Sequence, residues 1–387
     1  MSEWKEYKLG DIADINMGQS PNSSFYNKIG GGIPFLQGNR TFGFKYPTFD
    51  TYTTAITKIA EQNDVIMSVR APVGDVNITP VKMCLGRGVC GLRANNGNQE
   101  FLYYLMRYYA KELINKESGT VFGSINRNDI YNLIIKQPSN REQTQIASIL
   151  SSLDDKIAVN RKICENLEAQ AQALFKHWFI DFAPFKDGKF IESDSGTVYL
   201  SDISEQITDG VHNSVKDEPN SSYMLFSCKN IVGGVLNKSS FRSISKDTFD
   251  LLRKRTKLAK GDVLLSSVGT IGEIAIVEEE PVNYEFQRSV AIVKPKQNIG
   301  TYFVYNALLA NKAKLQHAAH GAVQQCLFIG DLKKVEVCCF DKAKAFLYNE
   351  TVKPLFEEIS KLHQENLRLS TLRDTLLPKL MSGQIKV

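Results

Sequence analysis

The sequence lacks the features that mark secreted, membrane-bound or disulfide-stabilised proteins. Its seven cysteines form no C-x-x-C pair and their number is odd, so we expect free thiols in a reducing compartment. No apolar run approaches the ~18 residues that a membrane-spanning helix needs. The polar start MSEWKEYKLGD has no signal-peptide core. We therefore expect a soluble, cytoplasmic protein.

Motifs of catalysis are equally scarce. There is no nucleophile elbow, H-E-x-x-H or Walker motif, no N/D-P-P-Y/F motif of amino-methyltransferases and no P-D…E/D-x-K nuclease pattern. Residues 86–91 match G-x-G-x-x-G, but the sequence LRANNGNQ that follows cannot open a dinucleotide-binding helix. His317 and His320 could share a helix face, yet no third metal ligand is evident. We predict no catalytic residues, no metal site and no cofactor bound by this chain.

What the chain does contain is a long stretch without glycine or proline, residues 141–181. Its apolar or small residues recur at steps of four and three, the heptad pattern of a coiled coil. The seam residues are Ile146, Leu150, Leu153, Ile157, Asn160, Cys164, Leu167, Ala171, Leu174 and Trp178. Such a helix would be roughly 60 Å long, with Ser139 or Asn140 as its N-cap. We expect Asn160 to fix the register and Asp154 and Asp155 to face solvent.

The first half of the chain recurs in the second half in the same order. Residues 63–78 return as 261–276, residues 85–93 as 286–294, and residues 118–130 as 320–332. A second heptad helix follows, with an expected kink at Pro354 and an end marked by Pro378 and Gly383. Its seam residues are Val352, Leu355, Ile359, Leu362, Asn366, Leu369, Arg373 and Leu376. Asn366 is a candidate partner of Asn160 across the seam.

These patterns predict an α+β protein with two globular mixed α/β domains, separated by a long antiparallel two-helix coiled coil and related by a pseudo-two-fold internal repeat. The predicted segments are a first domain at residues 1–140, a central spacer helix at 141–182, a second domain at 183–340 and a C-terminal spacer helix at 341–387. The helices would then hold the two domains apart, as a rod with a domain at each end.

The two domains keep one framework but differ in their loops, as modules with different targets do. The loops are rich in residues that reach DNA bases and phosphates. A net charge of +5 and a sequence pI of about 8.6 permit a polyanionic partner without requiring one. The predicted DNA-contacting residues are Gln19, Ser20, Asn22, Arg40, Arg70, Arg87, Asn126, Arg127, His212, Lys229, Arg253, Lys254, Ser266, Arg288, Gln324 and Gln325. Each could instead be an ordinary surface residue, and the matching pair Arg87 and Arg288 could share a structural role.

Several short motifs are spread along the whole chain. They are Gly18-Gln19-Ser20-Pro21, residues 63–66, Ser118-Gly119, residues 141–147, 153–157 and 173–182, then residues 261–265, Glu365-Asn366 and residues 372–383. With them, the chain resembles the DNA specificity (S) subunits of type I restriction–modification systems. One departure is that residues 209–213, DGVHN, stand where the second domain should repeat the Gly-Gln-Ser-Pro turn, which leaves that loop unpredicted.

The resemblance implies that each globular domain is a target recognition domain that reads one half of an asymmetric, bipartite site in double-stranded DNA. It implies that the paired helices act as the spacer and dock two methyltransferase (modification) subunits, which restriction subunits then join. S-adenosylmethionine, ATP and Mg would belong to those partners, and the S subunit itself would be non-catalytic, with no role for a membrane.

Two other hypotheses stay open on the sequence. One is an assembly scaffold that does not read DNA, for instance an orphan or truncated specificity protein. The other is a DNA-modifying enzyme, against which the missing motifs argue. Sequence preference of the complex reconstituted with a methyltransferase partner would separate a DNA reader from a scaffold. Salt must be varied in this measurement, because phosphate contacts alone bind DNA without specificity.

Overall fold

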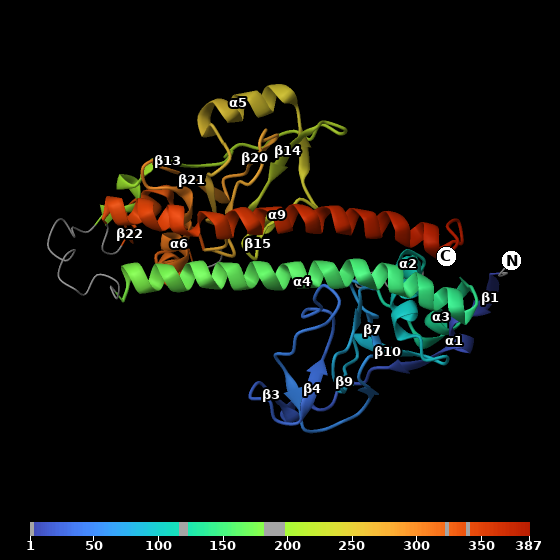
Figure 1. Ribbon diagram of the computed structural model, residues 1–387. Helices are drawn as coiled ribbons and strands as arrows, with labels where there is room; N and C mark the ends of the chain where they lie inside the picture. The colour runs from blue at the N-terminus through green and yellow to red at the C-terminus, as the bar shows by residue number, and fades with distance from the viewer. Residues whose placement is uncertain (1–3, 116–122, 182–197, 322–324, 338–340) are drawn as a thin grey trace. The chain divides into compact units, whose positions relative to one another are not determined.

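The computed structural model describes residues 4–115, 123–181, 198–321, 325–337 and 341–387. The chain forms two compact units, the first made of Met1–Asn160 with Gln364–Val387 and the second of Arg161–His363. Each unit therefore holds part of each long helix, α4 (Asn140–Phe179) and α9 (Lys342–Met381), shown in green and red in Figure 1. The units group the chain differently from the four predicted segments, because each part of a helix packs on globular residues of its own unit.

The first unit is built on a four-stranded antiparallel sheet of order β2-β10-β7-β8 and a five-stranded sheet of order β3-β5-β4-β9-β6. The strands of the first sheet are β2 (Ala13–Met17), β10 (Val89–Ala94), β7 (Val65–Ser68) and β8 (Val76–Ile78). Those of the second are β3 (Tyr26–Asn27), β5 (Tyr52–Thr53), β4 (Ile33–Leu36), β9 (Met83–Leu85) and β6 (Ile59–Ala60). A small pair, β1 (Lys5–Lys8) with β11 (Ile134–Gln137), and the helices α1 (Leu9–Ile12), α2 (Gln99–Ile114) and α3 (Arg127–Tyr131) complete it.

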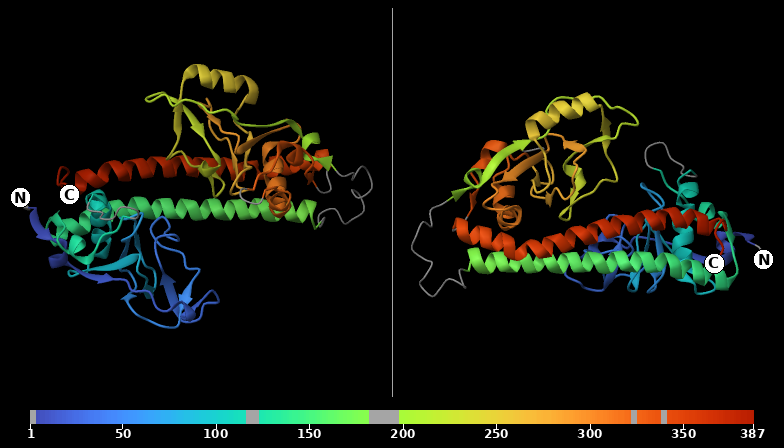
Figure 2. Two further views of the ribbon diagram at one scale, coloured as in Figure 1. Left: turned by 180° about the vertical axis from the view of Figure 1, so that it is seen from behind. Right: turned by 45° about the horizontal axis from the view of Figure 1, so that its top comes forward.

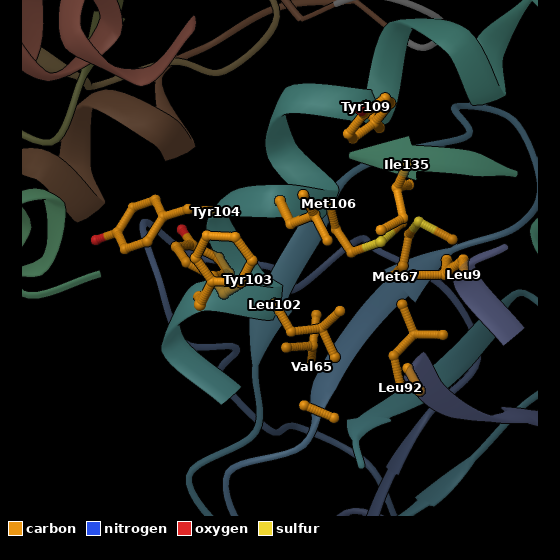
Figure 3. Close-up of a cluster of buried hydrophobic side chains, with 14 of the residues drawn as sticks. Leu9, Val65, Met67, Leu92, Leu102, Tyr103, Tyr104, Met106, Tyr109 and Ile135 are labelled. Carbon is orange, nitrogen blue, oxygen red and sulfur yellow. The ribbon is translucent and has the colours of Figure 1, made fainter. Parts of the chain in front are cut away.

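Strand β7 shows why this sheet has two apolar faces. Successive side chains of a strand point to opposite faces, and all four residues of β7 are fully buried. Val65 and Met67 join the cluster beneath α2, whereas Ile66 joins a second cluster with residues of the five-stranded sheet. Figure 3 shows Leu102 of α2 beside Val65, within the first cluster.

The second unit repeats this plan with different accessory strands. Its four-stranded sheet has the order β13-β21-β18-β19, the same connectivity as the sheet of the first unit. The strands are β13 (Ser204–Asp209), β21 (Val290–Pro295), β18 (Val263–Ser266) and β19 (Ile274–Ile276). Beside it lie a three-stranded sheet of β17 (Arg242–Ile244), β14 (Tyr223–Phe226) and β20 (Tyr284–Phe286), and the pairs β15 (Ile231–Val232) with β16 (Val235–Leu236) and β12 (Val198–Tyr199) with β22 (Glu336–Val337).

The helices of the second unit follow the order of the first, except that α5 (Lys246–Thr256) has no counterpart there. The others are α6 (Thr301–Ala310), α7 (Lys312–His317) and α8 (Ile329–Lys333). Strand β18 again divides its side chains, with Val263 and Leu265 in one apolar cluster and Leu264 in another. Phe303 of α6 packs into the same cluster as Val263, as Leu102 of α2 does with Val65 in the first unit. The predicted α+β class is confirmed.

Within the first unit, α4 and α9 lie side by side and run in opposite directions (Figures 1 and 2). The fully buried Asn160 donates from Nδ2 to Asn366 Oδ1 at 3.0 Å and to Glu365 Oε2 at 2.7 Å. The Asn160–Asn366 pairing that the heptads suggested is therefore present. Six residues before Asn160 on α4, Asp154 accepts a hydrogen bond from Arg373, which follows Asn366 on α9. The two helices are therefore antiparallel.

In the second unit the same two helices pack through apolar and aromatic residues. Cys164 Sγ lies 4.0 Å from the carbonyl oxygen of Ile359, and the buried Tyr348 donates from its hydroxyl to the carbonyl oxygen of Ala171 at 2.8 Å. Trp178, near the end of α4, contacts Tyr348 with ring centroids 6.0 Å apart. These contacts show that α4 and α9 are antiparallel in this unit too.

One detail of the long helices differs from the prediction, because Pro378 lies inside α9 and does not end it. Helix α9 continues through Pro354 and Pro378 to Met381, since packing of its apolar stripe outweighs the hydrogen bonds that the prolines remove. Gly383, with φ of +73°, then donates to Leu380 and ends the last turn. At the other helix, Ser139 accepts a hydrogen bond from the amide of Glu142 at 3.4 Å, which supports the predicted N-cap.

Among the residues that the structure describes, no helix is long and apolar enough to cross a membrane. Residues 183–197 of the predicted second domain and the Ser118-Gly119 motif lie outside the described residues.

Candidate nucleic-acid interface

Four loops of the first unit meet at one end of its sheets. They follow β2, β4, β7 and β9, and backbone hydrogen bonds tie them together. These bonds run from Gly18 N to Val89 O (3.0 Å), Gln19 N to Leu85 O (2.9 Å), Gly86 N to Leu36 O (2.8 Å), Gly88 N to Gln37 O (3.0 Å) and Val69 N to Gly88 O (2.9 Å). Loops that are linked in this way present their side chains from a rigid support, as a binding site requires.

Glycine is required where the first of these loops leaves β2. A Cβ atom on Gly18 would lie 2.0 Å from the carbonyl oxygen of Gly86, closer than any real contact. The close approach lets Ser20 reach its neighbours, because Ser20 Oγ donates to Gln37 Oε1 at 3.2 Å and accepts from Arg87 N at 3.1 Å. The turn Gly18-Gln19-Ser20-Pro21 is therefore a structural joint between three loops.

The second unit has the same joint, although its sequence does not repeat that turn. Gly210 N donates to Val290 O at 3.2 Å and Val211 N to Phe286 O at 2.8 Å. A Cβ atom on Gly210 would lie 1.9 Å from the carbonyl oxygen of Phe286. Gly210 thus takes the place of Gly18, and the loop that sequence left unpredicted has the same backbone hydrogen bonds.

The predicted residues of the first unit fall into two groups. Gln19, Arg70 and Arg87 are exposed at the joined loops, and Arg70 forms a β-bridge with Ser124. Ser20 serves the joint itself. In the second group, the side chains already have local partners: Arg40 pairs with Asp50 at 2.6 Å, Asn22 caps the turn of Ser23–Phe25, Asn126 caps α3, and Arg127 lies over the ring of Tyr131 at 5.9 Å. All four of these remain exposed.

In the second unit, Lys229 and Arg288 are exposed at the matching loops, and the exposed Gln325 accepts a hydrogen bond from Gly269 N through its carbonyl oxygen at 3.1 Å. His212 is exposed but pairs with Asp209 at 2.7 Å. Lys254 is exposed on α5. Gln324 lies outside the described residues.

Two residues predicted to contact DNA, Arg253 and Ser266, have side chains with partners inside the second unit. Arg253 Nε lies 2.5 Å from the fully buried carboxylate of Glu285, and its Nη2 donates to the carbonyl oxygen of Tyr284 at 2.9 Å. Burial raises the pKa of Glu285, and Arg253 counteracts that shift, so this arginine fastens α5 to β20. Ser266 is fully buried, donates to the Thr270 carbonyl oxygen and accepts from Glu273 N.

The residues assigned to the helix seam are at least partly buried, whereas Asp154 beside them differs from its expectation. Ile146, Leu150, Ile157, Asn160, Ile359 and Leu362 are buried, and Leu153, Leu167, Leu174, Leu355, Asn366, Leu369 and Leu376 are partly buried. Asp154, which we expected to face solvent, is 1% exposed. Its carboxylate accepts from Tyr104 Oη and from Arg373 Nη1, each at 2.7 Å. Asp155 does face solvent, 3.6 Å from Lys45.

This buried network joins α2, α4 and α9 of the first unit. Arg107 adds a second cation 3.7 Å from Asp154. Burial lowers the pKa of Arg373, but hydrogen bonds to Asp374 and Asp154 more than offset this and raise it. The sequence contained one signal of the network, since Arg373 sits among apolar seam residues and needs an anion opposite.

No group of three His, Cys, Asp or Glu side chains is placed to hold a metal in the part of the chain that the structure describes. A cavity of about 160 Å³ lies at the first turns of α2 and α4, smaller than the ~300–1,000 Å³ of ligand pockets. The side-chain amides that line this cavity form hydrogen bonds with one another. Asn96 Nδ2 lies 3.0 Å from Asn140 Oδ1 and 2.9 Å from Gln143 Oε1.

Two units with one strand connectivity, joined loops and exposed basic side chains define a recognition protein. The fold is that of a solved type I restriction–modification S subunit from M. genitalium, with a TM-score of 0.59 at 17% identity over 98% of this chain and 96% of that chain. Residues 1–169 match the family model described as the type I restriction modification DNA specificity domain.

Similarity to named relatives extends beyond that domain. The chain is 25% identical to the type I restriction enzyme MjaIX specificity subunit of Methanocaldococcus jannaschii, over 100% of this chain and 94% of the relative. It is 41% identical over 170 residues to a protein of the same organism assigned as the MjaX specificity subunit, a match that spans 40% of that protein. Over its whole length the chain is thus similar to specificity subunits of type I restriction–modification systems, and its residues 1–169 match their DNA specificity domain.

Proposed function

We propose that this protein reads an asymmetric, bipartite DNA site, with one half-site bound by each unit. The observation that carries the proposal is the shared joint of loops, which has matching backbone hydrogen bonds around Gly18 and Gly210 but presents different side chains. A common support explains how both units bind DNA, and different side chains explain why the half-sites would differ. We also propose that the α4–α9 pair, which packs antiparallel within each unit, is a coiled coil between two repeated domains. The length of this helix pair would set the spacer between the half-sites.

We further propose that the outer faces of α4 and α9 dock two methyltransferase subunits, which restriction subunits then join. Apolar side chains on the exposed faces of these helices would be covered by such a partner. In the first unit they are Ile149, Val159, Leu367 and Leu372. The partners would supply S-adenosylmethionine binding, ATP use and Mg, and the whole complex would act on double-stranded DNA.

Reconstitution with a methyltransferase partner tests the reading of DNA. The complex is incubated with a pool of DNA fragments and S-adenosylmethionine, and the methylated fragments are sequenced at several salt concentrations. We expect enrichment of one split sequence. Methylation without sequence preference at every salt concentration would contradict DNA reading and favour the scaffold or orphan alternative.

A loop replacement tests the assignment of one half-site to each unit. Residues 201–219 and 221–238 of the second unit are exchanged for those of a relative with another target. We expect only one half of the enriched sequence to change. A change in both halves, or in neither, would contradict the modular assignment.

A further inference from the structure

Arg87 and Arg288 occupy the same place in the two loop joints. Arg87 N donates to Ser20 Oγ at 3.1 Å, and Arg288 N donates to Val211 O at 2.9 Å. The next residue in each case accepts an amide hydrogen bond from the loop after the neighbouring strand, at 2.9 Å from Val69 N in the first unit and from Ser267 N in the second. The backbone of each arginine is therefore held from both sides.

Their side chains, by contrast, are not used within the protein. Both arginines are exposed, and neither guanidinium has an ion pair or hydrogen bond with any residue that the structure describes. A fixed backbone with an uncommitted cation is unlike Arg253, whose charge is neutralised by Glu285. It is the arrangement expected of a group that meets an external anion.

The positions around each arginine differ between the units. Matching backbone bonds and bridges align Gln19 with Val211, Gln37 with Ser227, and Arg70 with Val268. If the units read different half-sites, these changed positions can account for the difference. A side chain kept in both units cannot by itself distinguish two sequences, so it should meet what both half-sites share, which is the sugar–phosphate backbone.

We propose that Arg87 and Arg288 are the phosphate anchors of the two units and that Gln37, beside Arg87, reads a base. The inference rests on the proposed function and deepens it. Ser20 Oγ donates to Gln37 Oε1, which leaves the two Nε2–H donors of Gln37 to face the DNA. They suit the acceptors of the major groove, which are purine N7, guanine O6 and thymine O4, and they repel the amino group of cytosine.

Binding by the reconstituted methyltransferase complex separates the roles. Dissociation constants are measured against salt concentration, on the selected duplex and on duplexes with single base changes in the first half-site. For Arg87→Ala we expect affinity at ~0.1 M salt to fall about five- to tenfold on all duplexes, and the slope of log affinity against log salt to shrink by about 0.9. Arg288→Ala should behave alike. Lys8→Ala and Lys314→Ala, which also remove exposed cations, should change neither quantity.

The conservative variant and the glutamine variant sharpen the test. Arg87→Lys should retain the salt slope and the sequence preference, because a phosphate accepts a point charge, whereas a guanine reader needs the bidentate fork. Gln37→Ala should leave the slope unchanged and remove the preference at one base pair. Loss of base preference in Arg87→Ala, or an unchanged slope, would overturn the assignment. A wild-type complex without sequence preference would instead overturn the proposed function itself.

Discussion

At the scale of single residues, the buried carboxylate of Asp154 is where the structure departs most from the heptad pattern. We expect Asp154→Ala to lower the free energy of unfolding of the first unit by about 3–5 kcal/mol, because Arg373 and Tyr104 would lose their buried partner. Urea denaturation in a Trp178→Phe background measures this. The chain has two tryptophans, and Trp4 packs on the apolar core of this unit.

Asp155→Ala is the matched control, since it removes a neighbouring carboxylate that is 67% exposed. We expect less than about 0.5 kcal/mol from it. Equal effects of the two variants would show that the Asp154 network contributes nothing beyond an ordinary surface charge. The heptad pattern could not predict that Asp154 is buried. It sorts positions by polarity, so it assigns a polar residue beside the seam to the solvent-exposed face.

His363 provides a second prediction at this scale. Burial lowers the pKa of His363, but hydrogen bonds with Cys164 and Glu278 outweigh it and raise the pKa to about 10, above the ~6.5 of an unfolded histidine. A raised pKa means that the protonated form stabilises the folded state. The stabilisation is complete below about pH 6.5 and is lost as the pH rises through about 10.

We therefore expect the second unit to lose stability between pH 6.5 and 10, and His363→Gln to lose less over the same range. Urea denaturation in a Trp4→Phe background, followed by the fluorescence of Trp178 in this unit, measures both proteins. Other groups titrate in this range, but they are common to both proteins and cancel in the difference. Identical pH dependence in the two proteins would contradict the role given to His363.

At the scale of elements, the joint after β2 depends on a glycine that has no room for a side chain. We expect Gly18→Ala to destabilise the first unit by about 1–3 kcal/mol and to weaken binding of its half-site, because the carbonyl oxygen of Gly86 must move. Gly38→Ala is the control, as its Cβ would meet nothing within 4 Å. Normal half-site binding by Gly18→Ala would contradict the claim that the joint positions the loops.

The elements themselves were largely predictable from sequence. The glycine- and proline-free stretch at residues 141–181 corresponds to Asn140–Phe179. Gly383 follows the last turn of α9 as predicted, but Pro378 does not end the helix. A proline rule is local, whereas the packing of Leu380 and Met381 into the core of the first unit depends on distant residues.

The candidate interface was predictable only in part. Residue type alone suggested Arg87 and Arg253 equally, and only the fold separates an exposed cation from one that is paired with a buried carboxylate. Gln37 was missed, because its contact with Ser20 joins loops that are distant in sequence. The matching of Gly210 to Gly18 was hidden for a similar reason: backbone hydrogen bonds define it, and the residues around it have changed.

At the scale of the whole molecule, the proposed spacer can be tested by lengthening both long helices together. One heptad is inserted between residues 160 and 161 of α4 and another between residues 363 and 364 of α9, where the two compact units divide. Seven residues keep the heptad phase and add ~10 Å of helix, the length of about three base pairs. We expect the selected sequence to keep both half-sites and to gain up to about three base pairs between them.

A single insertion in α4 alone is the informative control. It shifts α4 against α9 by two turns on one side of the insertion, so the pairs around Asn160 and Asn366 and those around Ala171 and Tyr348 cannot both form. We therefore expect lower stability and no defined new spacer. The double insertion restores the pairing on both sides of the added heptads. If the double insertion changed the sequence of either half-site, the helices would act on base reading and not on spacing. If the spacer kept its length, the distance between the half-sites would be set by the partner subunits.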